Sequence, residues 1–221
     1  MIKDEIKCIS DLNKLKKTSE CVDCIDDLII VGFYTIDTPY ENEVKKTIES
    51  CKTLGLNYYF SGVSNFGDWQ KNTRYKSTFL RQCIDKFKDH RLLYVDCDAI
   101  INSTPILFKN YKCDIAVRWQ DFSWRKNECL SGTIYLEPND NTRNLCDIWI
   151  SENKKNQSDN NTLEQWNLGK IINDLESKGK LNSKNLDPEY TFIFDHMKKI
   201  YPNTIPIIEH FQASRKNRRL I

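Results

Sequence analysis

Apolar residues follow two different spacings along the chain, and their succession predicts a layered α/β fold. A continuous apolar run, typical of a strand buried on both faces, occupies Leu28–Tyr34, and two further strands are expected at Leu56–Phe60 and at the apolar run Leu92–Val95. Between them, apolar residues recur at helical spacing over Tyr40–Leu54 and Tyr75–Phe87. Because strands and helices alternate, we expect a mostly parallel, Rossmann-like sheet with right-handed crossovers, flanked by helices.

The second half continues with shorter segments. We expect two strands, two helices, an extended stretch and a final apolar run, at Asp114–Arg118, Gly132–Leu136, Asn141–Glu152, Leu163–Leu175, Leu186–Tyr190 and Ile205–Phe211. Residues 1–27 carry apolar side chains at helical spacing and are expected to form a Lys-rich helical extension. With no convincing linker after it, residues 28–221 are expected to form one compact α/β domain.

The composition fits a globular chain of this size. Of its 221 residues, 39% are hydrophobic and 29% are charged, which does not indicate disorder. The net charge of +2 provides no bulk field for nucleic acid, so no nucleic-acid partner is expected. All apolar runs are far shorter than a membrane span, so no transmembrane segment is expected.

Cysteine usage and the charged start of the chain bear on the compartment. Nine cysteines, an odd number at scattered spacings, argue against a complete disulfide framework. Cys21 and Cys24 form the one tight pair, and structural zinc would normally need a second such pair. Since no secretion leader opens the sequence, we expect a cytoplasmic, reducing location.

Two aspartates, Asp96 and Asp98, directly follow the third strand. Residues i and i+2 of an extended backbone point to the same side, so the two carboxylates can form a hard oxygen site for Mg²⁺ or Mn²⁺. The loop Thr35–Thr38 follows the first strand at the same expected sheet edge, where open α/β sheets bind ligands. A solvated loop could carry the same pair of aspartates. No dinucleotide or Walker glycine pattern is present, which disfavours Rossmann dehydrogenases and P-loop enzymes.

Taken in order, several short segments resemble a GT-A glycosyltransferase, one of the small nucleotide-diphospho-sugar transferases. The resemblance covers about Val31 to Arg215 and rests on Phe33-Tyr34-Thr35, Thr38-Pro39-Tyr40, Gly67-Asp68-Trp69 with Asn72, Lys76 before Phe79-Leu80, Leu93 to Ala99, Ser131-Gly132-Thr133, Glu164-Gln165 and Glu209 to Arg215. Each segment alone is weakly specific, whereas their order and spacing together are more so.

The resemblance implies a divalent metal, Mn²⁺ or Mg²⁺, and a nucleoside-diphosphate sugar donor, of which a UDP-sugar is favoured. Metal binding would fall to Asp96, Asp98 and His210, with an imidazole completing an oxygen site. The donor would be bound by Tyr34, Thr35, Thr38, Lys76, Asp96, Cys97, Ser131, Gly132, Arg215 and Lys216. A glycan or another hydroxyl compound would be the acceptor.

The catalytic residues that the resemblance implies are Glu164 and Gln165, with Asp121 as a further acid. In this pair Glu replaces the commoner Asp of the family. Inversion of the anomeric configuration would need a carboxylate base, which Asp121, Glu128 or Glu164 could supply. Retention would use the leaving phosphate instead, and our interpretation leans towards retention. We expect Trp119 and Trp124 to contact the acceptor, and His90 and His196 to be surface residues.

Other functions are consistent with the same elements. A nucleotidyltransferase that makes sugar nucleotides would ordinarily carry a Gly-rich basic signature after the first strand, where this chain has Tyr34 to Thr38. A non-catalytic nucleotide- or glycan-binding module is a second alternative, against which the presence of Asp96, Asp98 and His210 argues. A two-metal nuclease would need more clustered acids.

Overall fold

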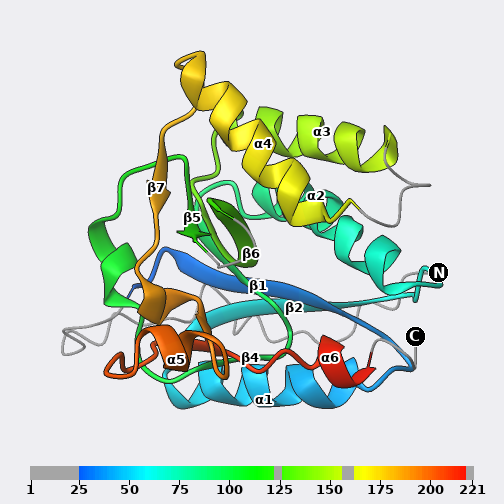
Figure 1. Ribbon diagram of the computed structural model, residues 1–221, viewed down its shortest axis with the longest axis vertical. Helices are drawn as coiled ribbons and strands as arrows, with labels where there is room; N and C mark the ends of the chain where they lie inside the picture. The colour runs from blue at the N-terminus through cyan, green and yellow to red at the C-terminus, as the bar shows by residue number, and fades with distance from the viewer. Residues whose placement is uncertain (1–24, 122–125, 156–161, 218–221) are drawn as a thin grey trace.

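A computed structural model describes residues 25–121, 126–155 and 162–217, and it is built around two β-sheets (Figure 1). The larger sheet has the strand order β2-β1-β3-β6-β5-β7, and the smaller one has the order β4-β9-β8. The strands are β1 (Leu28–Thr35), β2 (Asn57–Val63), β3 (Arg91–Val95), β4 (Ala99–Ile101), β5 (Ile115–Gln120), β6 (Glu128–Leu136), β7 (Ser183–Asn185), β8 (Phe192–Ile193) and β9 (Ile208–His210). The helical extension expected over residues 1–27 falls almost entirely outside the described residues.

The large sheet is mostly parallel, as predicted. β1 pairs in parallel with both β2 and β3, and β5 pairs in parallel with β7. β6 runs antiparallel to its two neighbours, β3 and β5. The pairing of β5 with β6 shifts register between Val117 and Arg118, so that residues 131–133 of β6 bulge away from β5. Bulges of this kind often redirect side chains next to a site.

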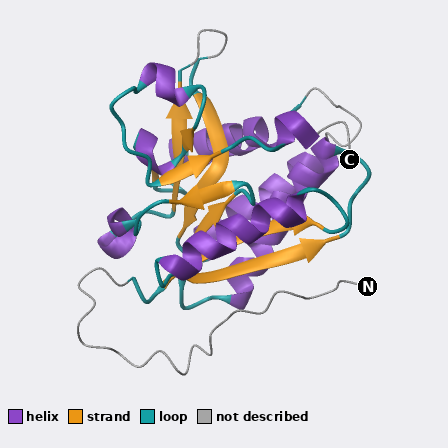
Figure 2. Ribbon diagram, turned by 90° about the horizontal axis from the view of Figure 1, so that it is seen from below, coloured by secondary structure: helices purple, strands orange, loops and turns teal. Residues whose placement is uncertain are grey.

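Helices cover both faces of the large sheet (Figures 1 and 2). They are α1 (Tyr40–Thr53), α2 (Trp69–Lys86), α3 (Asp140–Lys155), α4 (Glu164–Ser177), the short α5 (Met197–Ile200) and α6 (Ser214–Asn217), and the 3₁₀ turns η1 (Ile106–Asn110) and η2 (Pro188–Tyr190). α2, α3 and α4 share one core cluster with one face of the sheet, while α1 packs with β4 in the cluster on the other face. No helix among the described residues is both long and apolar enough to cross a membrane.

Helix α2 begins at Trp69, six residues before the predicted start at Tyr75. The reason is an N-cap: the Asp68 carboxylate accepts a hydrogen bond from the backbone N–H of Lys71 at 2.7 Å. The first turn carries few apolar residues, so hydrophobic periodicity alone did not reveal it. Lys76 consequently lies in the second turn of α2 and not at the start of the helix.

Other boundaries also differ from the prediction. β6 starts at Glu128, four residues before Gly132, and the extended stretch expected at Leu186–Tyr190 ends in the turn η2, where Pro188 begins the helical geometry. The short strand β4 was not expected. β4 pairs with β9, and this pairing brings β9, near the end of the chain, next to the residues that follow β3.

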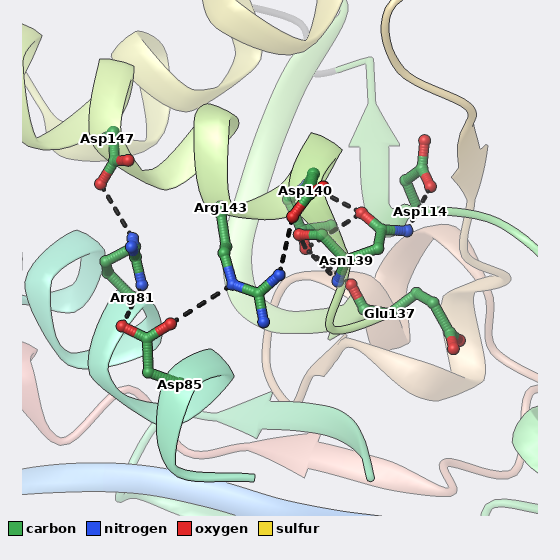
Figure 3. Close-up of polar contacts among 9 residues, drawn as sticks. Arg81, Asp85, Asp114, Glu137, Asn139, Asp140, Arg143 and Asp147 are labelled. Carbon is green, nitrogen blue, oxygen red and sulfur yellow. Dashed lines mark hydrogen bonds and ion pairs between the residues drawn. The ribbon is translucent and has the colours of Figure 1, made fainter. Parts of the chain in front are cut away.

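The outer faces of α2 and α3 are joined by ion pairs (Figure 3). Arg81 of α2 contacts Asp147 of α3 at 2.9 Å, and Arg143 of α3 contacts Asp85 of α2 at 3.3 Å. Exposed pairs of this kind each contribute about 0.2–1 kcal/mol. The apolar contacts beneath them therefore dominate the packing of the two helices.

Candidate functional site

A cavity of about 330 Å³ lies at the carboxyl ends of β1 and β3, where the sequence predicted a ligand site. Its walls come from the ends of β1 and β3, from α2, β6 and the start of α4, and from the segments around β8 and β9. Of the predicted site residues, the walls include Tyr34, Thr35, Lys76, Asp96, Cys97, Asp98, Ser131, Gly132, Glu164, Gln165, His210 and Arg215.

Asp96, Asp98 and His210 converge in this cavity. One ligand atom from each lies within 4.8 Å of the others, so the three residues could hold one metal ion. Local strand geometry places the two aspartates, whereas the antiparallel pairing of Ala99 with His210 brings the histidine from more than 100 residues away. The predicted clustering of these three side chains is confirmed.

The imidazole of His210 is oriented by Thr133. Its Nε2 lies 2.8 Å from Thr133 Oγ1, and its Nδ1 is buried without a hydrogen-bond partner among the described residues. Burial lowers the pKa of His210 to about 4, so the ring is neutral near pH 7. A neutral ring that donates from Nε2 has a lone pair at Nδ1, which is a suitable metal ligand.

Gly132 provides the space beside these groups. A Cβ at this position would lie 3.3 Å from both His210 Nδ1 and Asp96 Oδ2. The unpartnered nitrogen and the carboxylate oxygen therefore face the same small volume, which a side chain would narrow.

Asp98 is held from the opposite direction by the C-terminal segment. The backbone N–H of Ala213 donates to Asp98 Oδ2 at 2.6 Å. Burial, together with repulsion from Asp96, raises the pKa of Asp98 to about 7. A cation would relieve this repulsion, and two carboxylates with a neutral imidazole suit Mn²⁺ or Mg²⁺. The residues present thus fit a divalent metal.

Lys76 is buried and engaged by protein groups. Its Nζ lies 2.9 Å from Ser131 O, 3.1 Å from Glu164 Oε1 and 3.1 Å from Asp96 Oδ1. Burial lowers the pKa of this ammonium, but the two carboxylates more than compensate and raise the pKa above its usual range. Lys76 therefore links Asp96 at the end of β3 to Glu164 of α4.

Glu164 lines the cavity, and only one of its two carboxylate oxygens accepts hydrogen bonds from the described residues. Its Oε1 accepts hydrogen bonds from Lys76 and from Ser131 Oγ, the latter at 2.7 Å, while Oε2 is buried without a partner among the described residues. Burial raises the pKa of this carboxyl, although Lys76 acts in the opposite direction. An unpaired buried carboxylate oxygen can accept a hydrogen bond from a ligand hydroxyl.

Two further residues of the site were missed by the sequence analysis. Tyr94 donates its hydroxyl to Asp96 Oδ1 at 2.9 Å, and Thr133 binds His210. Tyr94 precedes Asp96 by two residues in β3, so the alternation of an extended strand could have suggested it. Thr133 had no such signal, because only the distant pairing of β4 with β9 brings His210 to it.

The end of β1 contributes Tyr34 and Thr35 to the cavity, and Tyr40 from α1 joins them. Thr38 is not among the described residues that line the cavity. Its hydroxyl donates to the Thr35 carbonyl at 2.7 Å, which fixes the loop after β1. Cys97 lines the cavity as a buried thiol, and burial raises its pKa well above the usual value.

Gln165 and Glu128 meet at another wall of the cavity. Glu128 Oε1 accepts hydrogen bonds from Gln165 Nε2 at 2.8 Å and from Trp166 Nε1 at 3.0 Å. Asp121, in contrast, is absent from the described lining of the cavity. Its exposed carboxylate accepts a hydrogen bond from the backbone N–H of Asn127 at 2.7 Å.

The C-terminal segment provides a cation at the rim. Arg215 lines the cavity and forms an ion pair with Asp195. Lys216 belongs to α6, but its side chain lies outside the described residues, as does Trp124. His196, which was expected to be a surface residue, is partly exposed and also lines the cavity. Trp119 packs against the core and is not among the described lining residues.

Comparisons with known proteins identify the fold. No protein-family model and no curated protein matches the sequence. A glycosyltransferase involved in glycosylation of the major capsid of PBCV-1 superimposes with a TM-score of 0.61 at 18% identity, over 86% of this chain and 96% of that chain. The glycosyltransferase GlyE of Streptococcus pneumoniae TIGR4 gives 0.58 at 13% identity, over 83% of this chain and 54% of GlyE, and its apo form gives 0.53 at 15%. The chain therefore has a glycosyltransferase fold.

Proposed function

We propose that this protein is a metal-dependent glycosyltransferase that moves a sugar from a nucleoside-diphosphate sugar, most simply a UDP-sugar, to a hydroxyl acceptor. The observation that carries the proposal is the convergence of Asp96, Asp98 and the unpartnered Nδ1 of His210 in one cavity of a glycosyltransferase fold. A divalent cation bound there would neutralise the charge that develops on a departing diphosphate.

The two ends of the cavity suit the two parts of the donor. Tyr34 and Tyr40 offer aromatic surface for a nucleobase, and Thr35 offers a hydroxyl for the ribose. Arg215 at the rim can pair with phosphate oxygens once a ligand competes with Asp195. Lys216 is proposed to assist it, on the basis of its position alone.

The sugar would bind between β6 and α4. Gly132 and Ser131 border this region, and Oε2 of Glu164 can accept a hydrogen bond from a sugar hydroxyl. Lys76 acts as a positioning residue, because its ammonium holds Asp96 and Glu164 in fixed relation. The amide of Gln165 lies nearby but already donates to Glu128.

A thermal-shift panel of UDP-, GDP- and other nucleotide sugars, with and without Mn²⁺, tests this function. A ligand at about 100 times its Kd stabilises the native state by about 2.7 kcal/mol. We expect at least one nucleotide sugar to raise the melting temperature only when Mn²⁺ is present. Equal shifts with Mn²⁺ and with EDTA, or no shift with any donor, would contradict the proposal.

A further inference from the structure

We infer that Glu128 is the catalytic base that removes the proton from the acceptor hydroxyl, so that transfer inverts the anomeric configuration. The inference rests on the proposed function and names the carboxylate that carries its chemistry. It departs from the retention towards which the sequence interpretation leaned.

Among the acids in the described lining of the cavity, Glu128 is the one that neither joins the candidate metal cluster nor pairs with a cation. Four acidic residues appear in its described lining: Asp96, Asp98, Glu128 and Glu164. The two aspartates belong to the metal site. One oxygen of Glu164 accepts hydrogen bonds from Lys76 and Ser131, and the positive charge of Lys76 makes the Glu164 carboxylate a weaker base. Asp121, the other candidate base, follows β5, is exposed to solvent and is absent from the described lining of the cavity.

Strand β6 carries three residues of the site at different positions along its length. Gly132 lies beside the metal ligands, Ser131 binds Lys76 and Glu164, and Glu128 begins the strand. Four residues of extended strand span at most about 13 Å, and the bulge at residues 131–133 shortens this. The interval accommodates a diphosphate and one sugar ring between the metal site and Glu128, which places the carboxylate on the acceptor side of the sugar.

Helix α4 holds one carboxylate oxygen of Glu128 in place. Two side chains of its first turn, Gln165 and Trp166, both donate to Oε1. Oε2 makes no hydrogen bond with the described residues, so it is available to an acceptor hydroxyl. One oxygen is thus held and the other is left to accept a proton.

An apolar wall adjoins this carboxylate. Leu130 packs against Phe192 and Met197, with Ile193 beside them, and both Leu130 and Ile193 line the cavity. A wall of this kind next to a base suits an acceptor that presents a hydroxyl together with a C–H face, as a carbohydrate does.

The proposed step conserves atoms and charge. Oε2 of Glu128 takes the hydroxyl proton while the acceptor oxygen forms a bond to the anomeric carbon from the side opposite the diphosphate. The bond between this carbon and the diphosphate oxygen breaks, and its electron pair leaves with the nucleoside diphosphate. The proton on Glu128 then passes to solvent.

The test uses UDP-α-D-glucose, UDP-α-D-galactose and UDP-N-acetyl-α-D-glucosamine with Mn²⁺ and the full chain, with water or methyl glycosides as acceptors. We expect NMR to detect the β anomer first. Glu128→Gln should slow sugar release about 100-fold or more, since general-base catalysis contributes at least that factor. Its amide oxygen can still accept both hydrogen bonds, so the Kd of UDP in the presence of Mn²⁺, measured by calorimetry, should not change.

Glu152→Gln, on α3 and outside the cavity lining, is the matched control and should turn over like the wild type. Release of the α anomer, an undiminished rate in Glu128→Gln, or a loss found in Asp121→Asn instead would overturn the assignment. So would Mn²⁺-dependent UDP binding without sugar release from any donor. Failure of UDP to bind in the presence of Mn²⁺ would instead contradict the proposed function itself. The calorimetric measurement detects this outcome independently of the sugar-release assay.

Discussion

At the scale of single residues, the hydrogen bond between Thr133 and His210 decides which ring nitrogen is available to a metal. If Nε2 carries the proton and donates to Thr133 Oγ1, Nδ1 presents its lone pair towards Asp96. Both side chains are buried, so water does not replace this contact. Thr133 would thus orient a ligand of the proposed metal without touching the ion.

Thr133→Val tests that role, because valine keeps the shape and removes the hydroxyl. We expect the Mn²⁺ affinity to fall about 10-fold, within the range for outer-shell partners of metal-binding histidines. Thr133→Ser, which restores a hydroxyl, should recover most of the affinity. Equal Mn²⁺ affinities of the valine and wild-type proteins, measured by calorimetry, would refute the role.

Asp98 is predicted to lower the free energy of unfolding near neutral pH when no metal is bound. Its pKa rises from an ordinary 3.8 to about 7 in the fold, so the folded state favours the protonated form. The stability that this preference contributes is complete below about pH 4 and is lost as the pH rises through about 7. In EDTA, Asp98→Asn should therefore gain stability relative to the wild type as the pH rises from about 4 to about 7, and should keep that gain at higher pH.

The difference in unfolding free energy between the two proteins, measured by urea denaturation at several pH values, isolates this contribution from that of His210. With Mn²⁺ added, the order should reverse, because only the wild type gains from the metal. A pH-independent difference in EDTA would show that Asp98 is not destabilising in the metal-free fold.

At the scale of secondary-structure elements, α2 is the helix that carries Lys76 into the site. It begins with the Asp68 cap, six residues before hydrophobic periodicity predicts. The cap orders the first turn, where Trp69 and Asn72 line the cavity. The start of α2 therefore shapes the cavity wall as well as the helix.

Asp68→Ala should lower the unfolding free energy by about 1 kcal/mol, the usual cost of losing an N-cap. For a chain of this length that corresponds to a melting temperature lower by about 2–4 °C. Asp68→Asn keeps an oxygen that can accept from Lys71 N, although it removes the ion pair with Lys71, and should lose less. Equal losses in the two variants would assign the effect to the charge and not to the cap.

At the scale of the whole molecule, the sequence predicts the parallel arrangement of β1, β2 and β3. The spacing of apolar residues and the alternation of strands with helices can both be read locally along the chain. The sequence also predicts that Asp96 and Asp98 form a pair, since alternation along a strand suffices for this. Thr133 could not be identified, because its partner arrives through a strand pairing that no local pattern encodes. The same limit placed Asp121 in the site, whereas the structure leaves it out of the described cavity lining.

The central claim is that Asp96, Asp98 and His210 bind one divalent metal that in turn binds a nucleoside diphosphate. The most direct measurement is an electron paramagnetic resonance titration of Mn²⁺ with UDP, on the wild type and on Asp98→Ala. We expect one UDP-strengthened Mn²⁺ site in the wild type and loss of that site in Asp98→Ala, with an unchanged circular dichroism spectrum. Equal Mn²⁺ binding by the two proteins, or binding indifferent to UDP, would contradict the claim.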